Sequence, residues 1–198
     1  STMRSAEDRV STAAAKPLTD LTYSGIYCGD GNTQIESQIT DWKTLFEVMT
    51  MSKYIESVTK TVDFQYSGSE GVVDVSPFVL KMDEEFKADE SNKHVERLRS
   101  SLKSDVHIEH RDKTAFEEIR EYVDEELKDD DNLTLEEALC GGRKTLIDLE
   151  EWLKEHHIEG IKSYVIGKDG KYPVLPYLLI GTYHGYYVGF AASVVWTQ

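Results

Sequence analysis

Histidines and carboxylates are the side chains of this sequence that could perform acid–base or metal chemistry. His156 and His157 are adjacent, so on a helix they point about 100° apart and cannot chelate one metal ion together. His107 and His110 fall on opposite faces of a short predicted strand, which also argues against a shared site. The histidine spacing therefore predicts neither a catalytic centre nor a metal centre.

The acidic stretch 126–137 has the carboxylate density of a calcium loop. The run Asp129, Asp130 and Asp131 with a final Glu137 resembles an EF-hand loop. With Glu137 aligned to the last ligand, however, Asp131 occupies the position where the loop needs glycine, and Lys128 occupies a ligand position. A helix end, a loop and a helix cap account for the same residues. No metal and no cofactor is expected.

Sequence motifs of the common enzyme classes are missing from the chain. It contains no Gly-x-Ser-x-Gly, no phosphate-binding loop, no HExxH and no dinucleotide fingerprint. We therefore predict a protein that is not an enzyme. An active site assembled from distant residues stays open as an alternative, because such a site leaves no local pattern.

Net charge is the most informative bulk property. The 198 residues include 37 acidic and 22 basic side chains, which gives a formal net charge of −15. Such a charge repels polyanions, so we expect no direct binding to nucleic acid or to an anionic membrane. It attracts a basic protein partner. The alternative that the acidity serves solubility alone stays open.

Carboxylates are concentrated in the middle of the chain, where residues 83–131 hold 18 Asp and Glu against 9 Lys and Arg. A predicted helix from Phe116 to Leu127 hides an apolar stripe and turns a row of carboxylates outward. A fixed row of this kind can compete with phosphates for the basic cleft of a nucleic-acid enzyme. An ordinary solvated helix face is the alternative. The predicted partner-binding carboxylates are Glu117, Glu121, Asp124 and Glu125.

Hydrophobic periodicity and turn residues define the elements that would position these groups. Residues 1–17 are predicted to form a mobile arm, and residues 18–198 a single domain. Helical spacing covers Leu45 to Val58, Val95 to Leu102, Phe116 to Leu127 and Leu146 to Leu153. Strand patterns cover residues 21–28, 62–66, 72–80, 106–108, 164–166, 174–180 and 186–197, with 62–66 and 72–80 forming a hairpin.

Cap and turn residues set the predicted ends of the helices. Thr114 with Glu117, and Thr134 with Glu137, have the spacing of capping boxes. Gly160 is the predicted C-cap of the last helix. Together these elements predict a mixed α/β protein of the α+β type. Its antiparallel sheet is packed between helices as an α-β-α sandwich.

The C-terminal strands carry a family resemblance. Tyr177 to Gly181, then Gly185, Gly189-Phe190 and Ser193 to Thr197, resemble the closing strands of the nuclease A inhibitor family, whose members end in an "IG…G…G…TxVVxT" arrangement. The resemblance covers about 55 residues closely. It implies an α-β-α sandwich that plugs the active site of a metal-dependent, non-specific nuclease.

Carried over residue by residue, the resemblance gives a role to Thr197, which corresponds to the threonine that approaches the nuclease magnesium through water. This chain has Trp196 where the family often carries an acidic residue, and Gln198 follows Thr197. We therefore predict an acidic macromolecule-binding protein, in one version a nuclease inhibitor, with Thr197 and Trp196 at the contact.

An alternative prediction is an interaction module that uses the aromatic C-terminal strands as an apolar patch. Tyr183 and Tyr187, with Tyr186 and Trp196, would form that patch. The pairing of Cys28 with Cys140 stays open, because two cysteines make no disulfide framework. The sequence leaves the compartment open and slightly favours the cytoplasm, and secretion is an alternative because a leader removed before residue 1 would leave no trace.

Overall fold

The computed structural model describes the protein from the first predicted helix onward, with gaps. The described residues are 42–60, 62, 75–83, 86, 93–102, 105–167 and 174–195. The predicted N-terminal arm, the predicted strand 21–28, nearly all of the predicted strand 62–66 and the residues Trp196 and Thr197 lie outside them.

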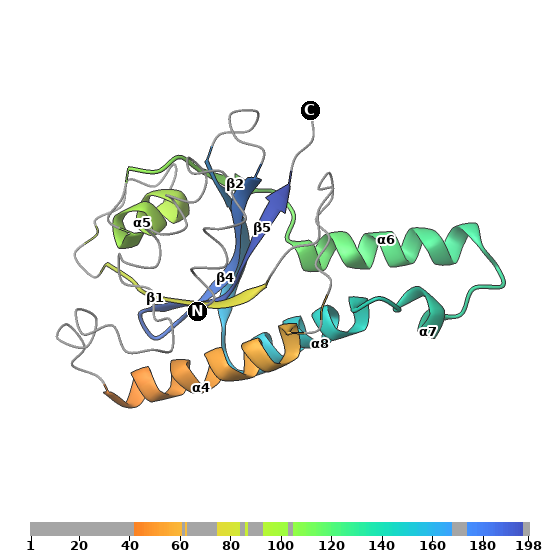
Figure 1. The fold of residues 1–198 in the computed structure, drawn as a ribbon, viewed down its shortest axis with the longest axis horizontal. Coiled ribbons are helices and arrows are strands. Elements are labelled where there is room, and N and C mark those ends of the chain that lie inside the picture. Colours follow the sequence, from red (N-terminus) through yellow and green to blue (C-terminus); the bar gives the residue numbers. More distant parts are fainter. Residues whose placement is uncertain are drawn as a thin grey trace.

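A five-stranded sheet forms the centre of the protein (Figure 1). Its strand order is β1-β5-β4-β3-β2, and every neighbouring pair is antiparallel. The strands are β1 Ser76–Lys81, β2 Ile108–Arg111, β3 Glu159–Ile166, β4 Val174–Tyr183 and β5 Tyr186–Val195. β1 overlaps the predicted strand 72–80 and pairs with β5. Its predicted hairpin with 62–66 lies outside the described residues.

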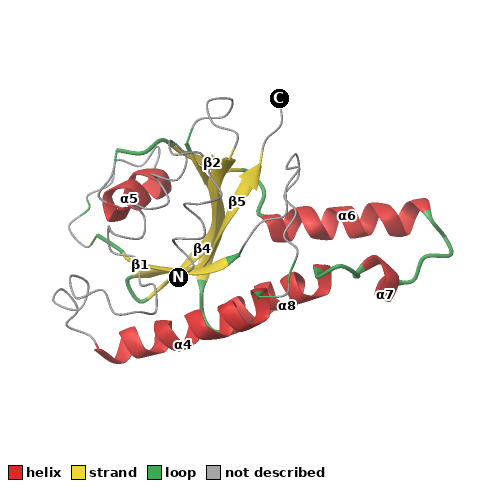
Figure 2. Ribbon diagram, viewed as in Figure 1, coloured by secondary structure: helices red, strands yellow, loops and turns green. Residues whose placement is uncertain are grey.

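Helices lie on both sides of this sheet (Figure 2), which confirms the predicted α-β-α sandwich. One face packs against α4, α8 and the start of α6, and we call it the groove face. The other face packs against α5, and we call it the α5 face. The helices are α4 Trp42–Thr59, α5 Lys93–Leu102, α6 Ala115–Asp129, α7 Leu135–Ala138 and α8 Arg143–Glu155.

Strand β4 shows why the sequence forms two cores. Tyr177 and Leu179 point to the groove face, whereas Leu178 and Ile180 point to the α5 face. Successive side chains of a strand alternate between faces, so a strand covered on both sides needs a continuous apolar run. All residues from 175 to 180 are buried accordingly.

The β4–β5 hairpin explains two of the glycines in the C-terminal pattern. His184 and Gly185 form its two-residue turn with φ values of 40° and 84°, as the tight hairpin turns of this twist require. At Gly189, a Cβ atom would come within 2.0 Å of the Leu179 carbonyl oxygen. The turn conformation therefore favours Gly185 and close strand packing requires Gly189, independently of the family resemblance.

The predicted capping residues had mixed outcomes. Thr114 and Glu117 form both hydrogen bonds of a capping box at the start of α6, as predicted. The prediction for Gly160 was wrong, because α8 ends at Glu155 and His157 adopts the left-handed conformation with a φ of 64°. Ile158 N–H then donates to the Leu153 carbonyl at 3.0 Å, which closes the helix five residues before Gly160.

None of the helices in the described part of the chain is long and apolar enough to cross a bilayer.

Candidate functional site

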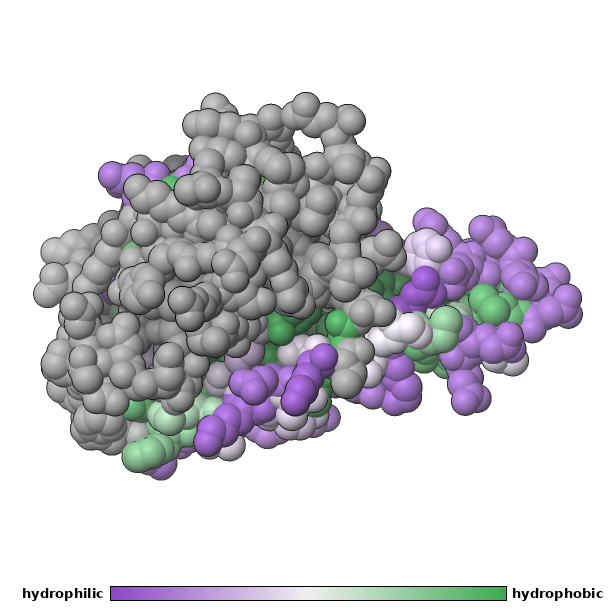
Figure 3. Space-filling model, viewed as in Figure 1, coloured by the Kyte–Doolittle hydropathy of each residue, from purple (hydrophilic) through white to green (hydrophobic). Residues whose placement is uncertain are grey.

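The acidic row predicted on α6 lies on one exposed face of that helix. Glu117, Glu121, Asp124 and Glu125 are all exposed, and their spacing of four, three and one residues keeps them on one side. The end formed by α6 and α7 extends beyond the sheet and is largely hydrophilic on the face shown in Figure 3. Lys113 pairs with Glu121 at 2.8 Å and partly offsets the negative charge.

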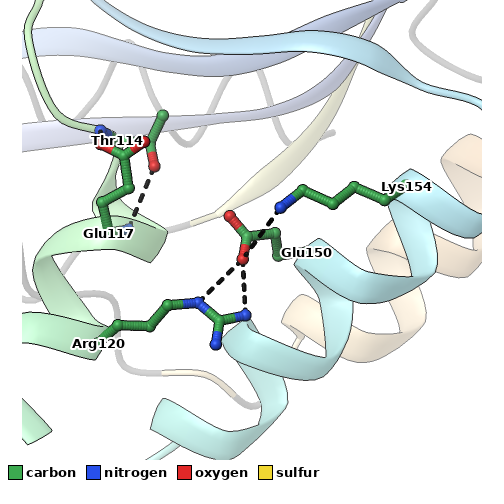
Figure 4. Close-up of polar contacts among 5 residues, drawn as sticks. All are labelled: Thr114, Glu117, Arg120, Glu150 and Lys154. Atoms are coloured by element: carbon green, nitrogen blue, oxygen red, sulfur yellow. Dashed lines mark hydrogen bonds and ion pairs between the residues drawn. The ribbon is translucent and has the colours of Figure 1, made fainter.

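Polar contacts join this acidic helix to the rest of the protein (Figure 4). Arg120 of α6 donates from Nε and Nη2 to Oε1 of Glu150, at 3.0 and 2.7 Å. Glu150 is buried on α8, and Lys154 lies 3.7 Å from the same oxygen. At the N-terminus of α6, the Ala115 N–H donates to the Tyr177 hydroxyl at 3.1 Å. The carboxylate row is thus presented from a fixed helix.

The three tyrosines of the predicted aromatic patch have different environments. Tyr187 is only 5% exposed and belongs to the core of the α5 face, so its prediction as a surface contact was wrong. Burial raises its pKa to about 12. Tyr186 is also buried, in the other core. Because helices cover both faces of the sheet, neither Tyr186 nor Tyr187 of β5 is left for a surface patch. Tyr183, at the end of β4, remains half-buried at the surface.

Tyr183 lies at a surface groove between α4, α8 and the β4–β5 turn. The groove has a volume of about 780 Å³. Phe46 and Tyr54 on its α4 side are 63% and 38% exposed. Large apolar side chains gathered at an open concave surface are typical of binding sites. The lining residues are Lys43, Phe46, Glu47, Thr50, Met51, Tyr54, Trp152, His156 and Tyr183.

Stacked rings form one wall of this groove. The Tyr54 ring lies 4.0 Å from the Trp152 ring, centroid to centroid, with 17° between their planes. His156 stacks on the same Trp152, also at 4.0 Å. Its Nδ1 lies 2.8 Å from the Trp152 carbonyl, which can only accept, so Nδ1 carries the hydrogen. The stack fixes three flat rings across two helices.

A carboxylate lies among these rings. The Tyr183 hydroxyl donates to Oε2 of Glu47, joining the β4 end to α4. Three causes raise the pKa of Tyr183. The largest is that hydrogen bond, and partial burial and the negative charge of Glu47 contribute less. Trp152 lies between Tyr54 and His156, so the ring faces left to attract a cation are those of Tyr54 and Phe46, and the nearby Glu47 carboxylate adds to this attraction. The groove thus has the chemistry to hold a cationic side chain beside an apolar one.

Sequence reasoning identified Tyr183 and missed the other aromatic residues of the groove. A signal was present in α4, where Phe46 and Tyr54 lie off the apolar face formed by Leu45, Val48 and Ile55. Large apolar side chains on the solvent side of an amphipathic helix indicate a contact surface. Nothing local could have placed Trp152, about a hundred residues away, against Tyr54.

Within the described ranges, no three His, Cys, Asp or Glu side chains gather where they could hold a metal ion.

Comparisons with known proteins leave the class of protein open. No protein-family model matches the chain, and no curated protein matches it. The function must therefore be argued from the groove and from the charge of the molecule.

Proposed function

We propose that the protein is a binding module for a partner protein, and that the groove between α4 and α8 receives a segment carrying Lys or Arg next to an aromatic or aliphatic side chain. The observation that carries this proposal is the open aromatic surface of Phe46 and Tyr54, with Trp152 stacked against Tyr54 and Glu47 beside the rings. Apolar contact and ring stacking supply affinity, and Glu47 selects a cation.

Charge supports a basic partner over an acidic one. The chain has a formal net charge of −15, and an acidic protein attracts a basic partner and accelerates its encounter. The exposed carboxylates Asp124 and Glu125 on α6 belong to the same field. In this proposal the carboxylates attract the partner during association, and the groove makes the specific contact with it. Exposed charges contribute more to association rates than to affinity.

Inhibition of a metal-dependent nuclease is a specific version of this proposal, and it is testable separately. It rests on Thr197 and Trp196, outside the described residues, and on the acidic row of α6. Nuclease activity measured with increasing protein over a salt series should show inhibition that weakens as salt screens the carboxylates. Full nuclease activity at low ionic strength would exclude this version and leave the groove proposal standing.

The groove proposal is tested with an array of short random peptides. We expect bound peptides to be enriched in Lys or Arg adjacent to Phe, Trp or Leu. Phe46→Ala should weaken binding of the selected peptides about tenfold. Leu135→Ala is the matched control, because Leu135 is 58% exposed on α7, outside the groove. Equal losses in both variants, or selection of acidic peptides, would refute the proposal.

A further inference from the structure

Basic side chains gather on the α5 face, on the opposite side of the sheet from the groove. β2 pairs with β3 so that His110 lies opposite Tyr164, and antiparallel partners point to the same face. Lys162, two residues before Tyr164, shares that face. α5 packs there, because its Leu98 belongs to the same core as Tyr164. The cluster consists of Lys93, His94 and Arg97 from α5, His110 from β2 and Lys162 from β3.

Cations elsewhere in the described structure are mostly matched by carboxylates. Arg120 pairs with Glu150, Arg143 with Glu126 and Lys144 with Asp148. By contrast, no side chain of the five-residue cluster forms an ion pair with any residue that the structure describes. In a protein with 37 acidic residues, neighbouring cations without a carboxylate partner among the described residues are unexpected.

The cations of the cluster act on one another. Partial burial and the charges of Lys162, His110, Arg97 and Lys93 lower the pKa of His94. Partial burial and Lys162 also lower the pKa of His110, against the opposing effect of Asp112. Such mutual repulsion is relieved when an anion binds between the groups.

We propose that this cluster binds a single phosphate group, either free or as the monoester of a small molecule. Arg97 offers a planar fork of donors, Lys162 a point charge and the two imidazoles N–H donors, which are the groups that hold phosphate in proteins. α5 begins at Lys93, so the positive end of its dipole lies beside the cluster. The net charge of −15 disfavours a polyanion but leaves a small dianion free to enter.

Among the described residues, the other charged and titratable groups around the cluster leave it positive. On α5, Glu96 is paired with Arg99. Asp112, which follows β2, is the carboxylate that acts on His110. Tyr187 of β5 and Tyr164 of β3 have raised pKa values, mainly because of burial, and are neutral at physiological pH. The site does not depend on the groove, so either proposal can fail alone.

Histidine ring signals in NMR spectra of the full chain provide the test. Inorganic phosphate, added at constant ionic strength near neutral pH, should shift the His94 and His110 signals saturably and raise the pKa of both residues. Arg97→Gln and Lys162→Gln should each weaken the apparent affinity about tenfold, as loss of a charged hydrogen bond predicts. Lys53→Gln, an exposed lysine of α4, is the matched control and should have no effect.

Phosphoserine as the free amino acid distinguishes the two sources of phosphate. Tighter binding of phosphoserine supports an organic monoester, and equal or weaker binding supports the free anion. The proposal is overturned if chloride produces the same shifts, if the shifts do not saturate at millimolar phosphate, or if Lys53→Gln weakens them as much as Arg97→Gln. Two cluster variants are used so that a folding defect in one does not decide the result.

Discussion

The groove face and the α5 face share one sheet but leave opposite chemistry exposed. On the groove face, α4 and α8 bury Leu45, Val48 and Leu149 against the strands and expose aromatic rings beside Glu47. On the α5 face, Leu98 and Leu102 are buried in the same way, but a cluster of cations from α5, β2 and β3 lies at the surface. The cores determine the fold, and the outer sides of the helices determine what each face could bind.

The largest expected effect is a loss of stability when either of the two cores, one on each face of the sheet, is disrupted. Phe116→Ala removes a buried ring that packs edge-on against Phe190, with 6.2 Å between centroids. We expect a loss of about 3–5 kcal/mol in the free energy of unfolding, because the cavity is large and enclosed. Leu98→Ala, on the α5 face, should cost about 2–5 kcal/mol. Denaturant titration measures both, and a loss below 1 kcal/mol in either would contradict the assigned core.

The ion pair of Arg120 with Glu150, which joins α6 to α8, is expected to make the next largest contribution to stability. Arg120→Ala leaves the buried Glu150 with Lys154 as a more distant partner, so we expect a loss of about 1–3 kcal/mol. Lys144→Ala breaks an exposed pair with Asp148 and should change stability by less than about 0.5 kcal/mol. If the two variants were equally stable in thermal unfolding, the pair of Arg120 with Glu150 would not fix α6 against α8.

The cap of α6 should contribute about as much as a single helix cap usually does. Thr114→Ala removes the acceptor of the Glu117 N–H, so we expect a loss of about 1 kcal/mol. Thr114→Ser keeps the oxygen and should recover most of the stability. Hydrogen exchange at the first turn of α6 gives the local readout, and unchanged protection in the alanine variant would contradict the capping role.

The smallest expected effect is a change in the pKa of Tyr183 when its hydrogen bond to Glu47 in the groove is removed. The raised pKa of Tyr183 means that its hydrogen bond to Glu47 is present below the ordinary tyrosine pKa of about 10 and is lost as pH rises through the higher folded value. Glu47→Gln should lower the Tyr183 pKa, measured by ultraviolet titration against a Tyr183→Phe reference. An unchanged titration would show that Glu47 does not hold this ring.

The sequence was informative where local chemistry decides structure. The pattern of residues 174–180 predicted the strand β4, and Thr114 with Glu117 predicted the start of α6. It failed at Tyr187, because the predicted sandwich covers both faces of the sheet with helices and so leaves no exposed side for the aromatic patch that was also predicted. It also failed at Gly160, because His157 accepts a left-handed conformation at the helix end.

The candidate sites depend on contacts between distant segments. Tyr54 and Trp152 meet only because α4 packs beside α8, and no spacing in the sequence encodes that contact. The same is true of His94 and His110, which approach each other when α5 covers β2. The composition predicted an acidic binding protein, but the three-dimensional packing was needed to find where a cationic segment would fit.

The most direct test of the groove is a titration with two short peptides that differ at one position. One carries Arg beside Phe, and the other carries Glu in place of the Arg. The fluorescence of Trp152, assigned by comparison with a Trp152→Phe variant, reports occupancy of the groove. We predict a saturable change with the arginine peptide and none with the glutamate peptide. Equal responses to both peptides, or no response to either, would contradict the account.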